Sequence, residues 1–484
     1  MTLTNYSDRQ SPQFRVLSDA QCRELYLATL ECLNRIGVLV YEEQARNLLA
    51  SAGADVDGER VYIPPHIIQE ALVTAPRTFT LWGRDRQHEL RISPDRVYYG
   101  PGPTCTYFLD PVTGERRKAR RGDAAYTARV SDALPNIDYV MSLSLYDDVT
   151  PVLSPVYEFA DMVANTGKPI AAWATDVHTL QDIHQIAAAA AGGAENLRRQ
   201  PIYTYFATYE SPLRHSEKTI ENLIWAARND VPIVYLGGPS VGVEAPVTGA
   251  SGLVVFLAAA LSGLAIAQLA QKGAPVIVGG VISAMDLRTA RPSYGSPEMS
   301  LYVAAAADLT RYLGLPFMGT AGASESKKPD AQAAIEASIE VLMNGLSGAG
   351  LVHDVGFLDC ADIGSLEMLV MCDEIISLVR RILRGVEVNR QTIMLDLIER
   401  VGPGNCFIAE PESAALCRSE IWMPKLLSRE TWVNWEKQGA KSMEQRVNER
   451  LQQILASHQP PPLPPGVAET IQSVLNAAEQ RCAR

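Results

Sequence analysis

Eight short apolar runs, separated by helical stretches of ten to twenty residues, constrain the fold of this chain most strongly. Each run is continuously apolar and does not alternate with polar residues, which is typical of a parallel strand buried on both faces. Eight strand–helix units over about 280 residues favour an α/β fold of the closed (β/α)8 type, a TIM barrel, over an open doubly wound sheet. The predicted strands are residues 97–100, 139–144, 169–175, 201–208, 232–238, 275–280, 316–322 and 350–356.

The segments on either side of the predicted barrel have a different pattern. Residues 1–96 predict an N-terminal helical cap with short strands, and residues 97–385 are assigned to the barrel. A polar, helical C-terminal extension follows over residues 386–458. Residues 459–484 begin with the proline-rich linker QPPPLPPG and end in an amphipathic helix, which we expect to dock on the body or on a second subunit.

One segment is long and apolar enough to cross a membrane. No charged residue occurs between Glu244 and Lys272, and the segment GASGLVVFLAAALSGLAIAQLAQ lies within that interval. However, it is rich in alanine, glycine and serine, and it continues the alternation of strands and helices. We therefore expect a buried helix and no membrane span, because a helix that is apolar on all sides is normally enclosed by protein.

Charge and cysteine usage restrict the class of partner and the compartment. The net charge is −12, which argues against nucleic acid as the main partner, because phosphate binding needs a basic face. Eight scattered cysteines without a CxxC motif indicate reduced thiols, and the polar N-terminus lacks the apolar run of a signal peptide. A cytoplasmic protein is the simplest interpretation. Neither GxGxxG nor GxxxxGK[ST] occurs, so a nucleotide site has little support.

The active site of such a barrel lies at the carboxyl ends of the strands, where this chain places aromatic and acidic residues. Aromatic rings together with negative charge suit a quaternary ammonium ligand. Such a cation donates no ordinary hydrogen bond, so it is held by aromatic faces and by nearby negative charge. For any single tyrosine, the alternative is that its ring packs between the barrel and the helices and takes no part in a binding site. The strand-end residues are Tyr98, Tyr99, Asp147, Asp148, Trp173, Thr175, Asp176, Tyr205, Tyr209, Glu210, Tyr235, Ser283, Met285, Asp286, Ser324, Glu325, His353, Asp354 and Phe357.

Other chemistries compete with an ammonium site at the same strand ends. His353 has too few neighbouring ligands for a metal site, so it either orients a substrate carboxylate or is a hydrogen-bonded core residue. Lys327 or Lys328 in a lyase or aldolase would form a Schiff base, although adjacent lysines more often begin a solvated helix. The loop GTAGASESKK after the seventh strand is a weak candidate for a phosphate cradle.

Several long segments resemble the trimethylamine methyltransferase family, in matching order and spacing and over nearly the whole chain. The similarity implies a barrel enzyme that transfers a methyl group from a methylated amine to the cobalt(I) of a corrinoid on a separate small protein. Since the chain contains no pyrrolysine, it resembles the branch that lacks this residue, whose substrates include glycine betaine. The segments are YYGPGPTCTYFLDPVTGERRKA, EFADMVANTGKPI, GTAGASESKKPDAQAAIEA, LVHDVGFLDCADIGSLEMLVMCDEI and EIWMPKLLSRETWVNWEKQGAKSMEQRVNERL.

The resemblance also implies pocket positions, namely Tyr98 or Tyr99, Asn165, His353 and Phe357. Together with strand-end position it gives the predicted substrate-binding set: Tyr98, Tyr99, Asn165, Tyr205, Glu210, Glu325, His353 and Phe357. We expect no directly bound cofactor and no metal, since the corrinoid (cobalamin) belongs to the partner protein. We also expect a homo-oligomer. The alternative to a methyltransferase is a relative that binds a betaine without catalysis. The segment EPESAALCRSE lacks the His-Thr pair of many relatives, which leaves the exact substrate open.

Overall fold

The barrel core consists of seven parallel strands in the spatial order β6, β18, β17, β14, β12, β10 and β9. The computed structural model describes residues 14–93 and 96–483. Each strand coincides with one of the predicted apolar runs. The bounds are β6 (Tyr98–Tyr99), β9 (Ile170–Ala172), β10 (Tyr203–Thr208), β12 (Ile233–Gly237), β14 (Val276–Gly280), β17 (Phe317–Thr320) and β18 (Leu351–His353).

The remaining predicted run, residues 139–144 and second along the chain, closes the barrel with a single bridge in place of a full strand. Val140 pairs in parallel with Ile170 of β9, and its N–H donates to the Pro169 carbonyl over 2.9 Å. On the other side, the Asp138 N–H donates to the carbonyl of Tyr99 in β6 over 2.7 Å. The predicted (β/α)8 fold is therefore confirmed. The second strand is short because Leu143 turns the backbone to a φ of 69°.

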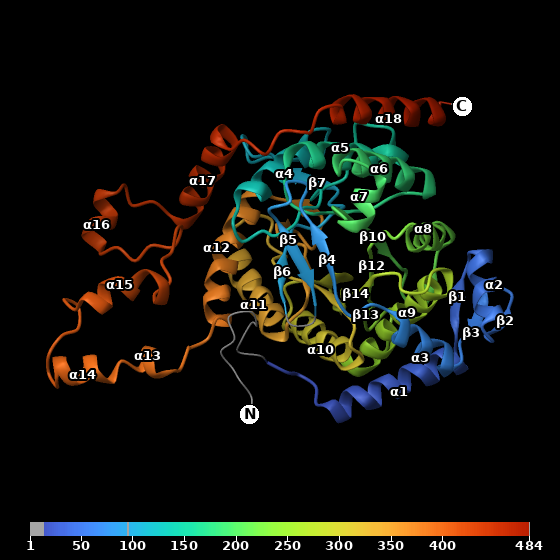
Figure 1. Ribbon diagram of the computed structural model, residues 1–484, viewed down its shortest axis with the longest axis horizontal. Helices are drawn as coiled ribbons and strands as arrows, with labels where there is room; N and C mark the ends of the chain where they lie inside the picture. Colours follow the sequence, from blue (N-terminus) through green and yellow to red (C-terminus); the bar gives the residue numbers. More distant parts are fainter. Residues whose placement is uncertain (1–13, 94–95, 484) are drawn as a thin grey trace.

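Helices follow the strands and enclose the barrel, as Figure 1 shows. Eight long helices, one for each strand, make up this outer layer, together with the short α7 and the 3-10 turn η1. Their bounds are α4 (Asp123–Ala133), η1 (Pro151–Leu153), α5 (Ser154–Asn165), α6 (Val177–Ala190), α7 (Ala194–Arg199), α8 (Glu217–Arg228), α9 (Gly249–Ala270), α10 (Pro297–Leu313), α11 (Ala331–Ser347) and α12 (Leu366–Leu383).

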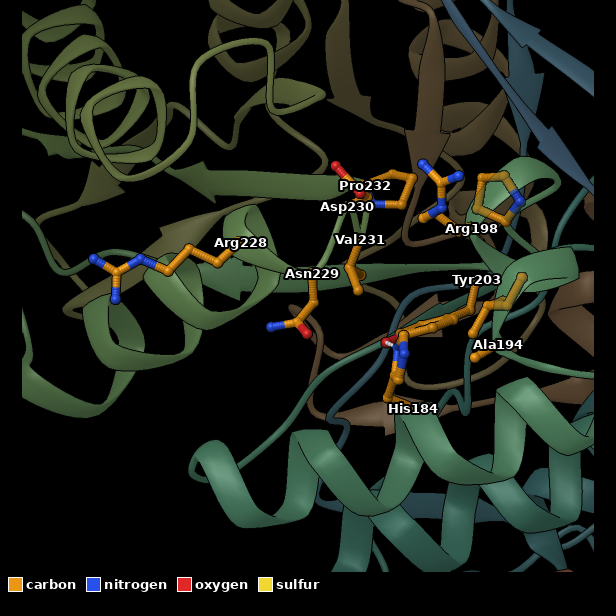
Figure 2. Close-up of a pocket in the computed structure, with 11 residues that line it drawn as sticks. His184, Ala194, Arg198, Tyr203, Arg228, Asn229, Asp230, Val231 and Pro232 are labelled. Carbon is orange, nitrogen blue, oxygen red and sulfur yellow. Dashed lines mark hydrogen bonds between the residues drawn. The ribbon is translucent and has the colours of Figure 1, made fainter.

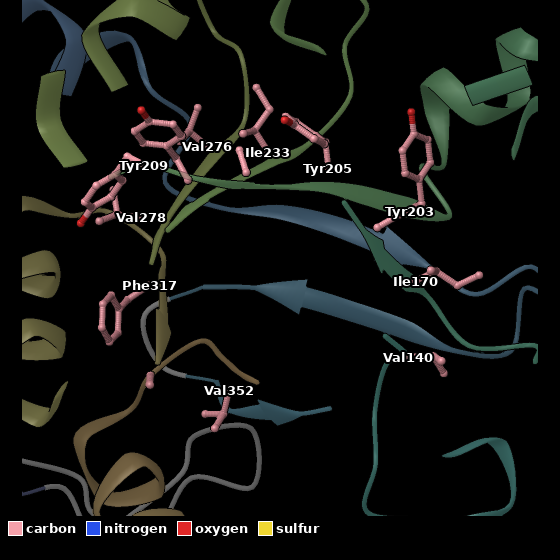
Figure 3. Close-up of a cluster of buried hydrophobic side chains, with 14 of the residues drawn as sticks. Val140, Ile170, Tyr203, Tyr205, Tyr209, Ile233, Val276, Val278, Phe317 and Val352 are labelled. Atoms are coloured by element: carbon pink, nitrogen blue, oxygen red, sulfur yellow. The ribbon is translucent and has the colours of Figure 1, made fainter. Parts of the chain in front are cut away.

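Alternation along the strands divides the buried side chains into two layers. Figure 3 shows the outer layer, in which Tyr203, Tyr205 and Phe317 point away from the strands. The inner layer is a separate cluster that includes Phe206 and Met318 and fills the barrel. Because neighbouring residues of a strand point to opposite sides, a shift of one position decides whether a side chain lies inside the barrel.

The N-terminal cap covers one side of the barrel, where it packs on α9. α9 passes a length and composition test for a membrane span, but 78% of its most apolar window is buried within the protein. The expectation of a buried helix is thus confirmed. Ser18 caps α1, and its side chain accepts a hydrogen bond from the backbone N–H of Gln21. The cap consists of α1 (Asp19–Arg35), α2 (Glu43–Ser51), α3 (Pro65–Thr74), β1 (Val38–Val40), β2 (Asp55–Asp57) and β3 (Arg60–Tyr62), with β11 (Arg214–His215) paired to β1.

One β-hairpin closes the barrel at the amino ends of its strands, and two small sheets form the rim at the carboxyl ends. The hairpin of β4 (Phe79–Trp82) and β5 (Glu89–Ile92) places Leu81, Leu90 and Ile92 in the inner cluster, at the amino ends of the barrel strands. At the carboxyl ends lie two small sheets. They comprise β7 (Tyr107–Leu109), β8 (Arg116–Lys118), β19 (Phe357–Leu358) and β20 (Ile363–Gly364), and β13 (Ser240–Val241), β15 (Ser283–Asp286) and β16 (Arg291–Ser293).

The C-terminal region first leaves the body and then returns to it. Four short helices extend away from the barrel, coloured orange in Figure 1, whereas α17 packs on α12 and α18 packs on α6. The terminal helix therefore docks on the body, as one of the two predicted arrangements had it. The bounds are α13 (Arg390–Ile393), α14 (Leu395–Val401), α15 (Pro411–Glu420), α16 (Trp432–Lys437), α17 (Met443–Ser457) and α18 (Val467–Cys482).

Candidate active site

The inward-facing residues at the carboxyl ends of the strands form the uppermost layer of the barrel. Ala172 of β9 lies opposite Tyr205 of β10, so the next residues along these strands, Trp173 and Phe206, are neighbours. Both belong to the inner cluster. The ring of His353 meets Phe206 edge to face, with 5.6 Å between the ring centroids. This mouth thus brings two aromatic rings and an imidazole together.

His353 is the centre of a short hydrogen-bonded chain. Its Nδ1 lies 2.5 Å from Asp354 Oδ1, and its Nε2 lies 3.1 Å from Thr320 Oγ1 at the end of β17. All three side chains are buried. The carboxylate of Asp354 favours an N–H on Nδ1, which leaves Nε2 and the Thr320 hydroxyl facing each other. These bonds hold the imidazole of His353 between a carboxylate and a hydroxyl at the carboxyl ends of β17 and β18.

Trp173 is held by a buried carboxylate from α5. Its indole Nε1 donates to Glu158 Oε2 over 2.9 Å, and the Ser154 hydroxyl donates to Glu158 Oε1 over 2.6 Å. Glu158 is only 1% exposed. Burial raises the pKa of this carboxyl above 4.5, whereas the hydrogen bonds from Ser154 and Trp173 lower it. An ionised Glu158 would add electron density to the indole, which strengthens the attraction of its face for a cation.

The loop after β18 carries the most restricted backbone of the mouth. Asp354 has a φ of 75°, and the consecutive residues Asp359, Cys360 and Ala361 have φ values of 51°, 57° and 65°. Non-glycine residues rarely adopt this conformation, and such strain is concentrated at functional sites. A Cβ on Gly102 would lie 2.3 Å from both Asp354 Oδ1 and the ring of Phe357. Because Gly102 has no side chain, the loop after β6 can pack directly against the loop after β18.

The two predicted carboxylates outside the barrel interior lie on the rim. Glu210 follows β10, is exposed, and forms an ion pair of 3.3 Å with Arg214. Glu325 follows β17 and accepts a hydrogen bond of 2.5 Å from Ser293. It borders a small rim cavity of about 130 Å³ that also contains Cys360. Burial raises the pKa of the Cys360 thiol to about 11, so it stays protonated at neutral pH.

Two predicted aromatic residues lie outside the barrel. The Tyr99 hydroxyl donates to the carbonyl of Val341 in α11 over 3.2 Å. Tyr205 belongs to the outer cluster, next to Asn222 of α8. Burial raises the pKa of both phenols. Each tyrosine is adjacent in sequence to a residue that points into the barrel, so its own side chain points outward. Neither tyrosine reaches the mouth, and neither belongs to the candidate site.

Two further predicted residues lie at the opposite end of the barrel. Tyr98 points inward but packs on the inner cluster beside Arg91 of the hairpin that closes the amino ends. Asn165 is the last residue of α5, just before β9 begins, and its Nδ2 donates to the carbonyl of Asp161 over 2.9 Å. The structure therefore brings His353 and Phe357 together at the mouth, with Glu210 and Glu325 at the rim, and separates them from Tyr98 and Asn165.

A larger cavity also lies at the amino ends of the strands. It has a volume of about 290 Å³ and is lined by residues that precede or begin β10 and β12 (Figure 2). Inside it, His184 Nδ1 lies 3.0 Å from the hydroxyl of Tyr203. Barrel enzymes carry their chemistry at the carboxyl ends of the strands, so this cavity is not the active site.

The alternative chemistries find no support in the geometry. Lys327 is exposed, donates to the carbonyl of Glu325, and pairs with Asp359 at 3.3 Å, whereas a Schiff base needs a neutral amine. The backbone amides of Ala323 and Glu325, which a phosphate cradle would use, donate to the carboxylates of Glu340 and Glu336. Within residues 14–93 and 96–483, no three His, Cys, Asp or Glu side chains are placed to hold a metal ion.

Sequence reasoning did not select Phe206, Thr320 or Glu158, and it named Trp173 only among the strand ends. The signal for Phe206 and Thr320 was present in the register, since both lie an even number of positions from other inward-facing residues. Nothing in the sequence pointed to Glu158, because its role depends on how α5 packs against the loop of Trp173.

A closed barrel with a polar chain and aromatic rings at its carboxyl-end mouth defines a (β/α)8-barrel enzyme. A family model described as trimethylamine methyltransferase matches residues 1–482. The chain is 30% identical to a trimethylamine methyltransferase from Desulfitobacterium hafniense over 464 residues, covering 96% of this chain and 93% of the relative. It is 27% identical to a glycine betaine methyltransferase from the same species over 466 residues, covering 96% and 97%.

Among solved structures, the chain resembles the monomethylamine methyltransferase of Methanosarcina barkeri, with a TM-score of 0.55 and 14% identity, over 92% of this chain and 88% of that one. At this identity the likeness concerns the fold. From the family match and the sequence relatives, the chain belongs to the trimethylamine methyltransferase family. The family predicted from the sequence is confirmed, and with it the assignment to methyltransferases.

Proposed function

We propose that this protein transfers a methyl group from a quaternary amine of the glycine betaine class to the cobalt(I) of a corrinoid carried by a separate protein. The observation that carries the proposal is the aromatic mouth, in which Trp173 is bonded to the buried carboxylate of Glu158 and lies beside Phe206. Relatives named as trimethylamine and glycine betaine methyltransferases support the same chemistry.

The chemistry explains why no acid–base pair is needed. A quaternary nitrogen already carries its positive charge, so the C–N electron pair goes to nitrogen and a neutral tertiary amine leaves without protonation. The corrinoid of the partner protein supplies the nucleophilic cobalt(I) that accepts the methyl group. The residues of this chain contribute orientation and a site shielded from water, which lower the barrier without proton transfer.

Each residue of the mouth has a distinct part in this proposal. The faces of Trp173 and Phe206 hold the trimethylammonium group, with each contact contributing about 0.5–2 kcal/mol. Glu158 fixes the indole and supplies negative charge below it. His353, held between Asp354 and Thr320, orients the substrate carboxylate. Phe357 closes the mouth, and Glu325 and Glu210 contribute negative charge at the rim.

The corrinoid protein approaches the same end of the barrel in this proposal, because the methyl group must meet the cobalt there. The rim carries both charges, with Arg291 Nη1 bound to Asp359 Oδ1 at 2.8 Å. A charged, polar rim suits a partner that binds and leaves in each turnover. A cytoplasmic location, a homo-oligomeric state and the absence of a membrane or nucleic-acid partner are part of the proposal.

Calorimetric titration of the purified protein with a matched panel tests the substrate class. The panel contains glycine betaine, choline, tetramethylammonium and 3,3-dimethylbutanoate, the uncharged-carbon analogue of betaine. We expect glycine betaine to bind more tightly than the other three, because it alone has both the cation and the carboxylate. Preference for the carbon analogue would contradict an ammonium site. Equal binding of choline and betaine would contradict the carboxylate contact.

A further inference from the structure

The terminal helix α18 connects the two ends of the barrel. At the amino ends, Arg84 of the β4–β5 hairpin donates to the carbonyls of Pro461 and Pro462 over 2.7 and 2.8 Å, which fixes the segment that leads into α18. At the carboxyl ends, Glu479 meets Thr150, the residue before η1. The helix has 16 residues, a rise of about 24 Å, and it packs on α5 and α6 between these points (Figure 1). α18 therefore reaches from one end of the barrel to the rim of the mouth.

Two side chains fix the end of α18 to the body at the rim. The carboxylate of Glu479 accepts hydrogen bonds from the Tyr157 hydroxyl over 2.8 Å and from the Thr150 hydroxyl over 2.9 Å. Tyr157 is buried in the first turn of α5. Arg481 forms an ion pair with Asp182 of α6 beside this contact. Hydrogen bonds to a carboxylate are about twice as strong as neutral ones, so Glu479 holds the start of α5 in place.

The start of α5 is in turn bonded to the cation-binding side of the mouth. Glu158, next in sequence to the tyrosine that Glu479 binds, accepts the indole N–H of Trp173 over 2.9 Å. The Thr175 hydroxyl, two residues beyond Trp173, donates to the carbonyl of Val152 in η1 over 2.8 Å. The strand end that carries Trp173 is thus tied to both η1 and α5. Glu479 contacts these two elements from the outside, so its position is transmitted to the indole.

We propose that Glu479 is a positioning residue of the methyl-transfer site, which acts from α18 through Glu158 to hold the indole face of Trp173 against the substrate ammonium. This inference rests on the proposed function, because it names what fixes the cation-binding side of the same mouth. It gives the terminal helix a part in substrate recognition, although α18 itself lies on the outside of the barrel.

The geometry of a cation–π contact explains why the indole needs such support. A cation is attracted by the face of the ring, so tilting the ring weakens the contact without removing the side chain. Binding groups have to be held to within about 0.5 Å and 10–20° of the productive arrangement, and hydrogen bonds to the groups behind them supply that precision. Glu158 bonds to the indole directly, and Glu479 bonds to the residue beside Glu158.

A role for Glu479 in stability alone leads to a different result. Val474, Leu475 and Ala478 are buried where α18 packs on the body, so the helix keeps its apolar contacts when the carboxylate is removed. If Glu479 only stabilised the fold, its substitution would lower the melting temperature and leave the affinity of the folded protein unchanged. A positioning role lowers the affinity of fully folded protein, and it does so through Trp173.

Titration calorimetry of the full-length protein with glycine betaine tests this role, with circular dichroism to show that each variant is folded. Glu479→Ala should raise the Kd about 3- to 10-fold, and by no more than Trp173→Leu does. Glu479→Gln keeps one acceptor oxygen and should have a smaller effect. Glu469→Ala is the matched control, because Glu469 is exposed in the first turn of the same helix, and it should leave the Kd unchanged.

The same substitution in a Trp173→Leu background shows whether Glu479 acts through the indole. Glu479→Ala should cause no further loss of affinity there, since the contact that it positions is already absent. An unchanged Kd in Glu479→Ala, or the same loss in both backgrounds, would overturn the proposal.

Fluorine NMR reports on the indole in the absence of substrate. Protein labelled with 5-fluorotryptophan gives a resonance for each of its six tryptophans, and that of Trp173 is identified by its loss in Trp173→Leu. We expect this resonance to shift in Glu479→Ala and not in Glu469→Ala, and an unshifted resonance would overturn the proposal. A shifted resonance in a protein that binds no betaine would support the positioning of Trp173 and contradict the proposed function, so the two failures are distinguishable.

Discussion

Replacing Trp173 by leucine isolates the attraction between the indole face and the ammonium group. Leucine keeps much of the apolar volume but removes the π face and the N–H that donates to Glu158. A cation–π contact contributes about 0.5–2 kcal/mol, with the larger value in sites shielded from water. Since about 1.4 kcal/mol is a tenfold change, the Kd for glycine betaine should rise about 2- to 30-fold.

A ligand of the same shape without the charge separates this effect from loss of packing. In 3,3-dimethylbutanoate a carbon replaces the nitrogen, while the three methyl groups and the carboxylate remain. Titration calorimetry on wild type and Trp173→Leu with both ligands gives the charge-dependent part as the ratio of the two changes in Kd. We expect betaine to lose affinity by a factor at least twice that of the carbon analogue, within about the 2- to 30-fold range.

Trp225→Leu is the control, because Trp225 packs against His184 in the outer layer, with ring centroids 5.4 Å apart. It should leave both affinities unchanged. Equal losses for the two ligands in Trp173→Leu would show that the indole acts only as apolar surface. No loss for either ligand would show that Trp173 does not contact the substrate, and the cation site would have to lie elsewhere in the mouth.

Three further predictions concern single residues. His353→Ala should raise the KM for glycine betaine about tenfold in the methyl-transfer assay but leave that for tetramethylammonium unchanged, since only betaine has a carboxylate; equal effects would contradict the contact. Burial raises the folded pKa of Glu158 above 4.5, so the stability it contributes is present below that pH and is lost as the pH rises through the folded pKa. Glu158→Gln should therefore gain free energy of unfolding relative to wild type towards neutral pH in urea titrations, and a constant difference would refute the shift. Burial lowers the pKa of Lys168 from 10.5 to about 8, so its unfolded form binds more protons between these values and stability should rise with pH across that window. Lys168→Met should abolish the rise and cost about 3 kcal/mol at pH 7 by thermal unfolding, because its Nζ donates to three backbone carbonyls; an unchanged pH profile would contradict this.

The fold was predictable because the strands of a barrel are continuous apolar runs with a regular spacing. All eight runs coincide with barrel segments, and the apolar helix over residues 249–270 is enclosed by the cap. These features depend on local composition and on the period of two or 3.6 residues, which one sequence contains in full.

The site was predicted only in part, because direction within a strand depends on register. Strand-end position alone selected Tyr205 and not Phe206, although the two are adjacent and point to opposite sides. His353 was selected, but its partner Thr320 comes from the neighbouring strand and is paired only in three dimensions. Glu158 lies in the middle of α5 and acts through Trp173, a relation that spacing along the chain does not encode.

The arrangement of the C-terminal extension was not predictable from the sequence. The polar, helical pattern predicted one extension over residues 386–458. The structure divides it into α17, whose Val447, Leu451 and Ile454 are buried, and the shorter helices α13 to α16, in which Leu397 alone is buried.

Direct observation of methyl transfer tests the proposed chemistry at the barrel mouth. The protein is mixed with glycine betaine labelled with ¹³C in its methyl groups and with a corrinoid protein reduced to cobalt(I), and the products are followed by NMR and absorption spectroscopy. We predict dimethylglycine and methylated corrinoid in equal amounts, with the rate strongly reduced in Trp173→Leu and unchanged in Trp225→Leu. Betaine that binds at the mouth but is never demethylated, with corrinoid proteins that accept methyl groups from related enzymes, would contradict a methyltransferase acting on this substrate.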